Sequence, residues 1–150
     1  MEEFKSVEKK MPPVLSRRSR HVISENDRVR SSVSAMVEND LPGLGSLMVK
    51  SHESLRDDFE VSSSELDAVV DIAVSSKGVY GARMTGAGFG GCAICLVSEN
   101  DVDDFVERLG AEYPLRTGRS MTIYMASPED GASVIYPGES MVPHAITQNP

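Results

Sequence analysis

Residues 86–91 are the part of the sequence whose residue types and spacing best suit chemistry. Four of these six residues are glycines, namely Gly86, Gly88, Gly90 and Gly91. Glycine tolerates positive φ angles and carries no Cβ, so such a loop lets a ligand or another backbone approach closely. We expect an anion-facing loop or, as the simpler alternative, a wide hairpin turn.

Two familiar nucleotide-binding motifs do not fit this loop. The spacing Gly86-x-Gly88-x-x-Gly91 satisfies the dinucleotide fingerprint, but that motif needs a helix directly after the glycines. Residues 92–97 are instead apolar and typical of a β-strand. No Gly-Lys-Ser or Gly-Lys-Thr follows, so the loop is not a Walker loop either.

The strand expected before the loop, residues 79–85, adds two polar side chains. Arg83 and Thr85 lie two residues apart and therefore share one face of a strand. There they would place a cation and a hydroxyl beside an anion held by the loop. Arg83 is equally compatible with a solvated cation on an exposed strand face.

The two cysteines, Cys92 and Cys95, have the C-x-x-C spacing of redox and zinc motifs. On a strand, residues three apart point to opposite faces, and a zinc site would need two further ligands nearby. No histidine is close in sequence. We therefore expect two reduced thiols in the core, as in a reducing compartment.

Hydrophobic periodicity predicts three helices ahead of the strands. The first has an apolar stripe of seven-residue spacing opposite a charged face. The stripe consists of Leu15, Val22, Val29 and Met36. Asp40 is a candidate N-cap of the second helix, and Asp57 and Asp58 form its polar end. Ser62 and Glu65 have the spacing of a capping box for the third helix.

The remaining elements alternate between strand and helix. The strands are expected at 79–85, 92–97, 121–126 and, more briefly, 134–136. A helix that begins at Asn100 or Asp101 follows the second strand, and Pro114 would close it. This order of elements predicts an α+β fold.

The chain divides into one domain with two flanking segments. Residues 1–11 are charged and aperiodic, residues 12–136 carry the patterned elements, and residues 137–150 lack periodicity, as a disordered tail does. A length of 150 residues suffices for one well-cored domain. Kinases with two substrates are usually larger, so a catalytic motif here can be only part of a site.

Charge and hydropathy argue against two classes of partner. The chain has 15 basic and 23 acidic residues, hence a net charge of −8, and a pI of about 4.8. Nucleic acids and anionic membrane surfaces select for basic patches instead. No apolar run reaches the ~18–20 residues of a membrane span, and the first residues do not form a signal peptide. We expect a soluble, cytoplasmic protein.

Residues 81–92, Gly-Ala-Arg-Met-Thr-Gly-Ala-Gly-Phe-Gly-Gly-Cys, resemble the third, glycine-rich motif of the GHMP kinases. This superfamily contains galactokinase, homoserine kinase, mevalonate kinase and phosphomevalonate kinase. Three further segments narrow the resemblance to the galactokinase family. They are residues 51–67, which begin Ser-His-Glu-Ser-Leu-Arg-Asp-Asp-Phe, residues 17–26, which begin Arg-Arg-Ser-Arg-His-Val, and residues 130–132, Asp-Gly-Ala.

The resemblance implies a ferredoxin-like α/β plait with additional N-terminal helices, the C-terminal domain of a GHMP kinase. It also implies galactokinase activity, in which the γ-phosphoryl group of ATP passes to galactose with the help of Mg²⁺ and gives galactose 1-phosphate. Carried over by position, the loop near the phosphates comprises Gly86, Gly88, Gly90 and Gly91, with Arg83 and Thr85 at its base.

Several parts of that family's site have no counterpart in the sequence. The galactose-recognition motif with its catalytic arginine, the Gly/Ser-rich ATP loop and the catalytic aspartate belong to the N-terminal half of the family. We therefore predict no catalytic residue and no metal ligand in this chain, and most of the ATP and Mg²⁺ site lies outside it. The chain alone should not phosphorylate galactose, as expected of a truncated or split kinase.

Two other functions remain open. In such a chain the cleft-facing surface would be exposed, and large apolar patches usually find partners. The alternative is thus a non-catalytic interaction module, which would form a homo-oligomer or bind an N-terminal kinase half. The second is a homoserine or mevalonate kinase activity. Those kinases share the glycine loop but lack the segment that runs here from Ser54 to Ser62.

Overall fold

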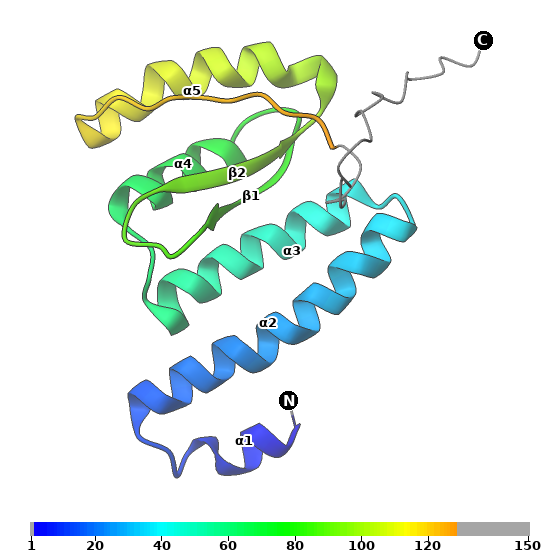
Figure 1. The fold of residues 1–150 in the computed structure, drawn as a ribbon, viewed down its shortest axis with the longest axis vertical. Helices are drawn as coiled ribbons and strands as arrows, with labels where there is room; N and C mark the ends of the chain where they lie inside the picture. Colours follow the sequence, from blue (N-terminus) through cyan, green and yellow to red (C-terminus); the bar gives the residue numbers. More distant parts are fainter. Residues whose placement is uncertain (1, 129–150) are drawn as a thin grey trace, which may run out of the picture.

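The computed structural model describes residues 2–128 and shows helices packed on a small antiparallel sheet (Figure 1). The elements are α1 (Glu2–Glu8), α2 (Pro13–Val37), α3 (Leu41–Ser54), the π-helical turn η1 (Leu55–Phe59), α4 (Ser64–Val74), β1 (Val79–Thr85), β2 (Cys92–Val97), the 3₁₀ turn η2 (Glu99–Asp101) and α5 (Val102–Thr117). Helix α2 packs on α3, α3 packs on β1, and α4 contacts both strands and α5. The α+β prediction is confirmed.

The apolar core lies between α4, β1 and α5. Its largest fully buried aliphatic side chain is Ile72 on α4, which is 0% exposed, and Ala82 of β1 is equally inaccessible. Phe105 and Leu109 of α5 close the core from the other side. These residues fall at the helical and strand periods that the sequence shows, so burial of their apolar faces stabilises this part of the fold.

The two strands are antiparallel, and their register places the glycine loop at the end of the hairpin. Thr85 pairs with Cys92, so the six residues between them form the connection. Helix α3 lies against β1 at very short range: a Cβ on Gly45 would come within 2.0 Å of the Tyr80 carbonyl oxygen, and one on Gly81 within 2.1 Å of the Gly45 carbonyl oxygen. Only glycine at both positions allows this approach.

The sequence predicts the helix ends with mixed success. Asp40 caps α3 as expected, because its side chain accepts a hydrogen bond from the Gly43 amide at 2.9 Å. The N-cap of α4 is Ser63 and not Ser62, since the Ser63 hydroxyl accepts a hydrogen bond from the Leu66 amide. Pro114 does not close α5, which continues to Thr117 because proline removes only one hydrogen bond of the helix.

The prediction of a third strand at 121–126 is wrong. The structure has no regular element at 119–128; Met121 packs against the core, whereas Tyr124 and Met125 are 87% and 74% exposed. Alternating apolar residues supply a suitable face, but a strand also needs a neighbour to pair with. Among the described residues the sheet consists of β1 and β2 alone. The predicted strand at 134–136, the tail at 137–150 and the Asp-Gly-Ala segment at 130–132 lie outside the described residues.

Helix α2 presents its apolar stripe to the surface, opposite to what an amphipathic pattern usually implies. The four stripe residues are 51–57% exposed; they are Leu15, Val22, Val29 and Met36. Its buried residues are Ser16, His21 and Ala35. On the polar face, which turns inward, arginines pair with Asp58 of η1 and with Glu60 directly after it. Residues 1–11, predicted to be aperiodic, contain α1, which buries Phe4.

The prediction of two core thiols is wrong for Cys92, which is exposed, whereas Cys95 is half-buried. The two side chains point to opposite faces of β2, as the strand period requires. Only one of those faces packs on the core, so Cys95 lies against it and Cys92 does not. Burial raises the pKa of the Cys95 thiol to about 11, which keeps it protonated at neutral pH. Both cysteines are free thiols.

Candidate functional site

The glycine loop between β1 and β2 has an unusual backbone. Five of its six residues have φ angles in the left-handed half of conformational space. They are Gly86 (82°), Gly88 (88°), Phe89 (58°), Gly90 (122°) and Gly91 (98°). Residues with a Cβ rarely adopt such angles, so the glycines are required by the backbone path and a simple two-residue hairpin turn does not account for them.

One edge of the loop is fixed to the segment after η1, and the other edge is open. The Phe89 amide donates to the Val61 carbonyl oxygen at 2.7 Å, and a Cβ on Gly88 would lie 2.2 Å from that same oxygen. At Gly86, Gly90 and Gly91 a Cβ would meet nothing within 4 Å. At these three positions the open edge carries no side chain, which favours close contact with a ligand.

A buried histidine anchors the strand that leads into the loop. His52 of α3 is 2% exposed; its Nδ1 accepts a hydrogen bond from the Met84 amide at 3.2 Å, and its Nε2 lies 3.1 Å from Asp67 Oδ1. Because Nδ1 accepts, the proton sits on Nε2 and the ring is neutral. Burial lowers the pKa of His52, in agreement with this tautomer. The spacing of apolar residues gave no sign of this role; only the resemblance marked the segment.

The predicted cation at the base of the loop, Arg83, has partners on α2 and on its own strand. Arg83 Nη1 lies 3.5 Å from Glu25 Oε1 of α2, and Arg83 Nε donates to the Met84 carbonyl oxygen at 3.0 Å. Arg83 therefore ties β1 to α2. Thr85 is half-buried at the end of β1, directly before the glycines. The structure places Thr85 next to the four glycines and pairs the guanidinium of Arg83 with Glu25.

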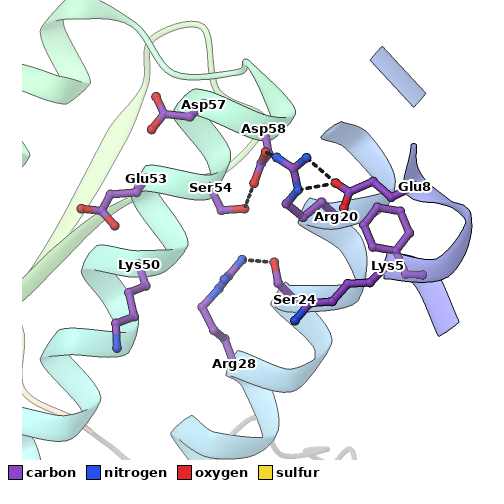
Figure 2. Close-up of a pocket in the computed structure, with 11 residues that line it drawn as sticks. Lys5, Glu8, Arg20, Ser24, Arg28, Lys50, Glu53, Ser54, Asp57 and Asp58 are labelled. Atoms are coloured by element: carbon purple, nitrogen blue, oxygen red, sulfur yellow. Dashed lines mark hydrogen bonds and ion pairs between the residues drawn. The ribbon is translucent and has the colours of Figure 1, made fainter. Parts of the chain in front are cut away.

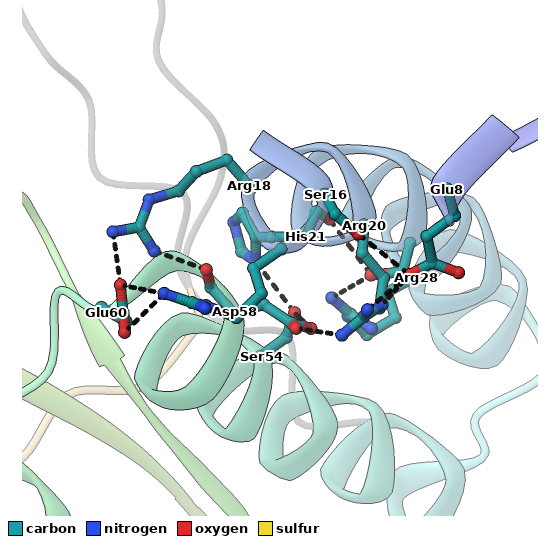
Figure 3. A network of polar contacts seen from close by, with 11 residues as sticks. Glu8, Ser16, Arg18, Arg20, His21, Arg28, Ser54, Asp58 and Glu60 are labelled. Carbon is teal, nitrogen blue, oxygen red and sulfur yellow. Dashed lines mark hydrogen bonds and ion pairs between the residues drawn. The ribbon is translucent and has the colours of Figure 1, made fainter. Parts of the chain in front are cut away.

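Charged residues of α2 pair with Asp58 of η1 and with Glu60 directly after η1, and we call these contacts the polar seam (Figure 3). Arg17 and Arg18 contact the carboxylate of Glu60 at 3.1 and 2.7 Å, and Arg20 contacts Asp58 at 2.8 Å. The pKa of Glu60 is lowered by hydrogen bonds from the two arginines. A π-helical turn such as η1 is rare in proteins and occurs frequently at functional sites. Sequence periodicity missed the seam, since it treats both charged faces as solvated.

His21 extends the seam into the protein interior. Its Nδ1 lies 3.0 Å from Ser54 Oγ, and Ser54 Oγ donates to Asp58 Oδ2 at 3.2 Å (Figure 3). The His21 ring also packs on Phe59, with 4.7 Å between the ring centroids. Burial lowers the pKa of His21 and favours its neutral form. Asp57 and Asp58, predicted as the polar end of the second helix, lie in η1 directly after it.

An open hollow of about 540 Å³ lies between α1, α2 and the end of α3 (Figure 2). Four basic and four acidic side chains line it, so their charges cancel. They are Lys5, Arg20, Arg28 and Lys50, and Glu8, Glu53, Asp57 and Asp58. Several of them already pair with one another or with neighbours, Arg20 with Glu8 and Asp58 among them. The hollow is separate from the glycine loop and does not favour an anion.

Within residues 2–128, no group of three or more His, Cys, Asp or Glu side chains is placed to hold a metal ion. The same part of the chain contains no helix that is long and apolar enough to cross a membrane.

The fold and the glycine loop define the class of protein to which the chain belongs. Residues 32–115 match the family model described as GHMP kinases C terminal. The chain belongs to this family, a family of kinases, and its structure is that of the GHMP kinase C-terminal domain. The matched range runs from the C-terminal part of α2 to the last turn of α5 and includes β1, β2 and the loop.

Within this class the chain is similar to galactokinases. It is 47% identical over 135 residues to the galactokinase of Clostridium beijerinckii, covering 89% of this chain and 35% of that protein. It is 48% identical over 123 residues to the galactokinase of Clostridium acetobutylicum, covering 82% and 32%. The chain therefore spans about a third of the length of these relatives, as a C-terminal part of a galactokinase-like enzyme does.

Solved structures give the same result. The crystal structure of Lactococcus lactis galactokinase complexed with galactose superimposes with a TM-score of 0.76 at 42% identity, over 79% of this chain and 31% of that one. The structure of L. major mevalonate kinase in complex with R-mevalonate gives a TM-score of 0.61 at 26% identity, over 77% and 34%. The higher similarity to galactokinase agrees with the segments that distinguish that family in the sequence.

Proposed function

We propose that this chain forms the C-terminal side of a galactokinase-type site, at which the γ-phosphoryl group of ATP is transferred to galactose. The observation that carries the proposal is the glycine loop, whose open edge at Gly86, Gly90 and Gly91 has no Cβ to keep a phosphate away. Phosphoryl transfer depends mainly on positioning and on stabilisation of negative charge, which backbone amides on a rim without side chains can supply.

We infer that Mg²⁺, which the family implies, is held mainly by residues outside the described part of this chain. Residues 2–128 bring no three candidate ligands together, so this part offers no all-protein cage for a metal ion, and Mg²⁺ would be held with the help of the ATP phosphates. Arg83, held by Glu25 at 3.5 Å, supplies no free cation beside the loop. The chain thus contributes shape and backbone donors, and the charge neutralisation that ATP requires must come from the rest of an active enzyme.

The proposal includes inactivity of the chain alone. Its purified form should yield no galactose 1-phosphate from ATP, Mg²⁺ and galactose. A folded chain, verified by circular dichroism, that turned over at even a hundredth of a typical kinase rate of ~1–100 s⁻¹ would contradict this part of the proposal.

A chimera tests the positive part. In it, this chain replaces the C-terminal third of C. beijerinckii galactokinase, to which it is 47% identical. We expect the chimera to phosphorylate galactose, whereas the same relative without its C-terminal third should not. If the chimera folds and binds galactose but transfers no phosphoryl group, the chain does not complete a galactokinase site.

The exposed stripe of α2 favours a second candidate function, an interaction module. Four aliphatic side chains that are more than half exposed on one helix face form a surface that usually finds a partner. We propose that the stripe supports association, either with an N-terminal kinase half or with a second copy. Sedimentation of the chain and of Val22→Glu tests this: association that the variant abolishes supports it, and a monodisperse monomer for both proteins counts against it.

A further inference from the structure

Glu60 is the residue at which η1 ends, and its backbone is left-handed, with φ 59° and ψ 47°. Side chains with a Cβ rarely adopt this conformation, and glutamate has no special tolerance for it. A non-glycine residue keeps such a conformation only where its surroundings enforce it, and such positions cluster at functional sites. The contacts of Glu60 show what enforces it.

Two arginines of α2 hold Glu60 from the side. Arg17 Nη2 lies 3.1 Å from both carboxylate oxygens, and Arg18 Nη2 lies 2.7 Å from Oε2. Arg18 also donates through Nη1 to the backbone carbonyl of Asp58, so α2 grips the main chain of the turn as well as its side chain (Figure 3). The Arg18 guanidinium stacks over the Phe59 ring at 5.4 Å, which fixes its direction.

The conformation of Glu60 determines where the next residue points. The amides of Glu60 and Val61 both donate to the Leu55 carbonyl oxygen, which closes the turn. The chain then reverses, and the Val61 carbonyl oxygen faces the glycine loop, where it accepts the Phe89 amide at 2.7 Å. The contact is close on both sides, because any Cβ on Gly88 would collide with that oxygen.

We propose that Glu60, clamped by Arg17 and Arg18, is a positioning residue for the glycine loop. The clamp keeps residue 60 left-handed, the left-handed turn aims the Val61 carbonyl, and this carbonyl holds the middle of the loop through Phe89. Helix α2, which does not contact a ligand in this scheme, thereby sets the shape of the open rim. The consequence for phosphoryl transfer rests on the proposed function, whereas the coupling between Glu60 and the loop does not.

Hydrogen exchange of the Phe89 amide in the chain itself tests the coupling. In Glu60→Ala the clamp is lost, and exchange at Phe89 should accelerate by at least about tenfold relative to the unaltered chain. The amide of Ile72 serves as the internal reference and should change by less than about twofold. Glu60→Gly is the decisive second variant: it also lacks the carboxylate but adopts positive φ freely, so it should recover most of the protection at Phe89.

A matched control distinguishes the clamp from a general loss of charge. Glu112 on α5 is also held by two arginines, Arg108 and Arg116, at 2.7 and 3.0 Å, but it does not contact the loop. Glu112→Ala should leave the exchange of Phe89 unchanged. Should Glu60→Ala prove unfolded, Arg17→Gln, which leaves residue 60 intact, should show a smaller acceleration at Phe89.

Two results would overturn the inference: equal exchange at Phe89 in Glu60→Ala and the unaltered chain, or equally fast exchange in Glu60→Gly and Glu60→Ala. In the chimera, Glu60→Ala should lower kcat/KM for ATP, and Glu60→Gly should restore it. An inactive chimera contradicts the proposed function and leaves the exchange result standing. A change in exchange without a change in kcat/KM contradicts the role of the clamp in the reaction.

Discussion

The core between α4, β1 and α5 and the seam between α2 and η1 are held together by different physical forces. In the core, apolar side chains such as Ile72 and Phe105 are at most 5% exposed, and burial of apolar surface dominates. In the seam, arginines of α2 meet Asp58 and Glu60, and the apolar side of the helix faces outward. Helix α4 thus buries its apolar face in the core, whereas α2 turns its charged face inward and its apolar face outward.

The difference bears on function, because the glycine loop is attached to both regions. His52 and β1 link the loop to the core, and Val61 links it to the seam. Exposed ion pairs contribute little free energy each and respond to salt and pH, whereas buried aliphatic and aromatic side chains carry no charge to screen or titrate. The core therefore provides stability, and the seam determines the direction in which one turn of the backbone points.

The largest expected contrast comes from one substitution made in each region. Val70→Ala removes a side chain that is 4% exposed in the core, and Val33→Ala removes one that is 53% exposed on α2. Both lie inside helices, so changes in helix propensity cancel. We expect Val70→Ala to lower the free energy of unfolding by about 2 kcal/mol, and Val33→Ala to change it by less than about 0.5 kcal/mol.

Urea denaturation of both variants measures these free energies. A comparable loss for Val33→Ala would show that the surface of α2 at Val33, one turn from the stripe residue Val29, is covered in solution, and the distinction between the two regions would then fail for that surface.

A pH titration provides the next contrast, since burial lowers the pKa of both His52 and His21 below 6.5. The folded protein favours the neutral rings, whereas the unfolded chain takes up protons near pH 6.5. Stability from these groups is therefore complete above pH 6.5 and falls as the pH drops below it, by at most about 1.4 kcal/mol per pH unit for each ring.

Thermal melts between pH 7.5 and 5.5 test this expectation. His52→Gln removes the contribution on the core side, and His21→Gln removes the one in the seam, so each variant should flatten the pH dependence in part. Profiles that keep their full slope in both variants would refute it. A Met84 amide resonance that shifts together with the His52 ring would identify the contact that protonation breaks.

The smallest effect concerns the ion pairs of Glu60. Arg17 and Arg18 lower its pKa from 4.5, so the contribution of the ionised carboxylate is present above about pH 4.5 and is lost as the pH falls through the lowered value. About 1 M NaCl should weaken the same contacts at neutral pH by screening. We expect either treatment to lower the protection of the Phe89 amide against exchange, relative to the intrinsic rate at the same pH, more than that of the Ile72 amide. An equal loss of protection at both amides would mean that the seam is no more sensitive to salt and pH than the core is.

The sequence predicts well where a local pattern determines the structure. The Asp40 cap, the strands on either side of the loop and the periodic face of α4 depend on residues within one or two turns of each other. The glycines of the loop are also recognised locally, because their positive φ angles need no distant contact. The family resemblance rests on these segments and on the segment around His52.

Other features depend on contacts that the local pattern does not contain. The stripe at Leu15 and Val22 marks an apolar face, but which face turns inward depends on acids some forty residues away, such as Asp58 and Glu60. The predicted strand at 121–126 has suitable residues, yet its existence depends on a pairing partner. The strand period places Arg83 beside the loop, but it gives no sign of the partner of Arg83, Glu25, which lies on a distant helix.

The kinetic effect of one added methyl group on the rim tests the central claim most directly. In the chimera, Gly90→Ala and Gly118→Ala both add a Cβ that meets nothing within 4 Å at a glycine of positive φ, the first on the open edge of the loop and the second at the C-terminal end of α5. At comparable melting temperatures, we expect Gly90→Ala to lower kcat/KM for ATP by about tenfold or more and Gly118→Ala to leave it within about twofold. Equal kcat/KM values for the two variants would contradict the assignment of the loop to the phosphate end of the site.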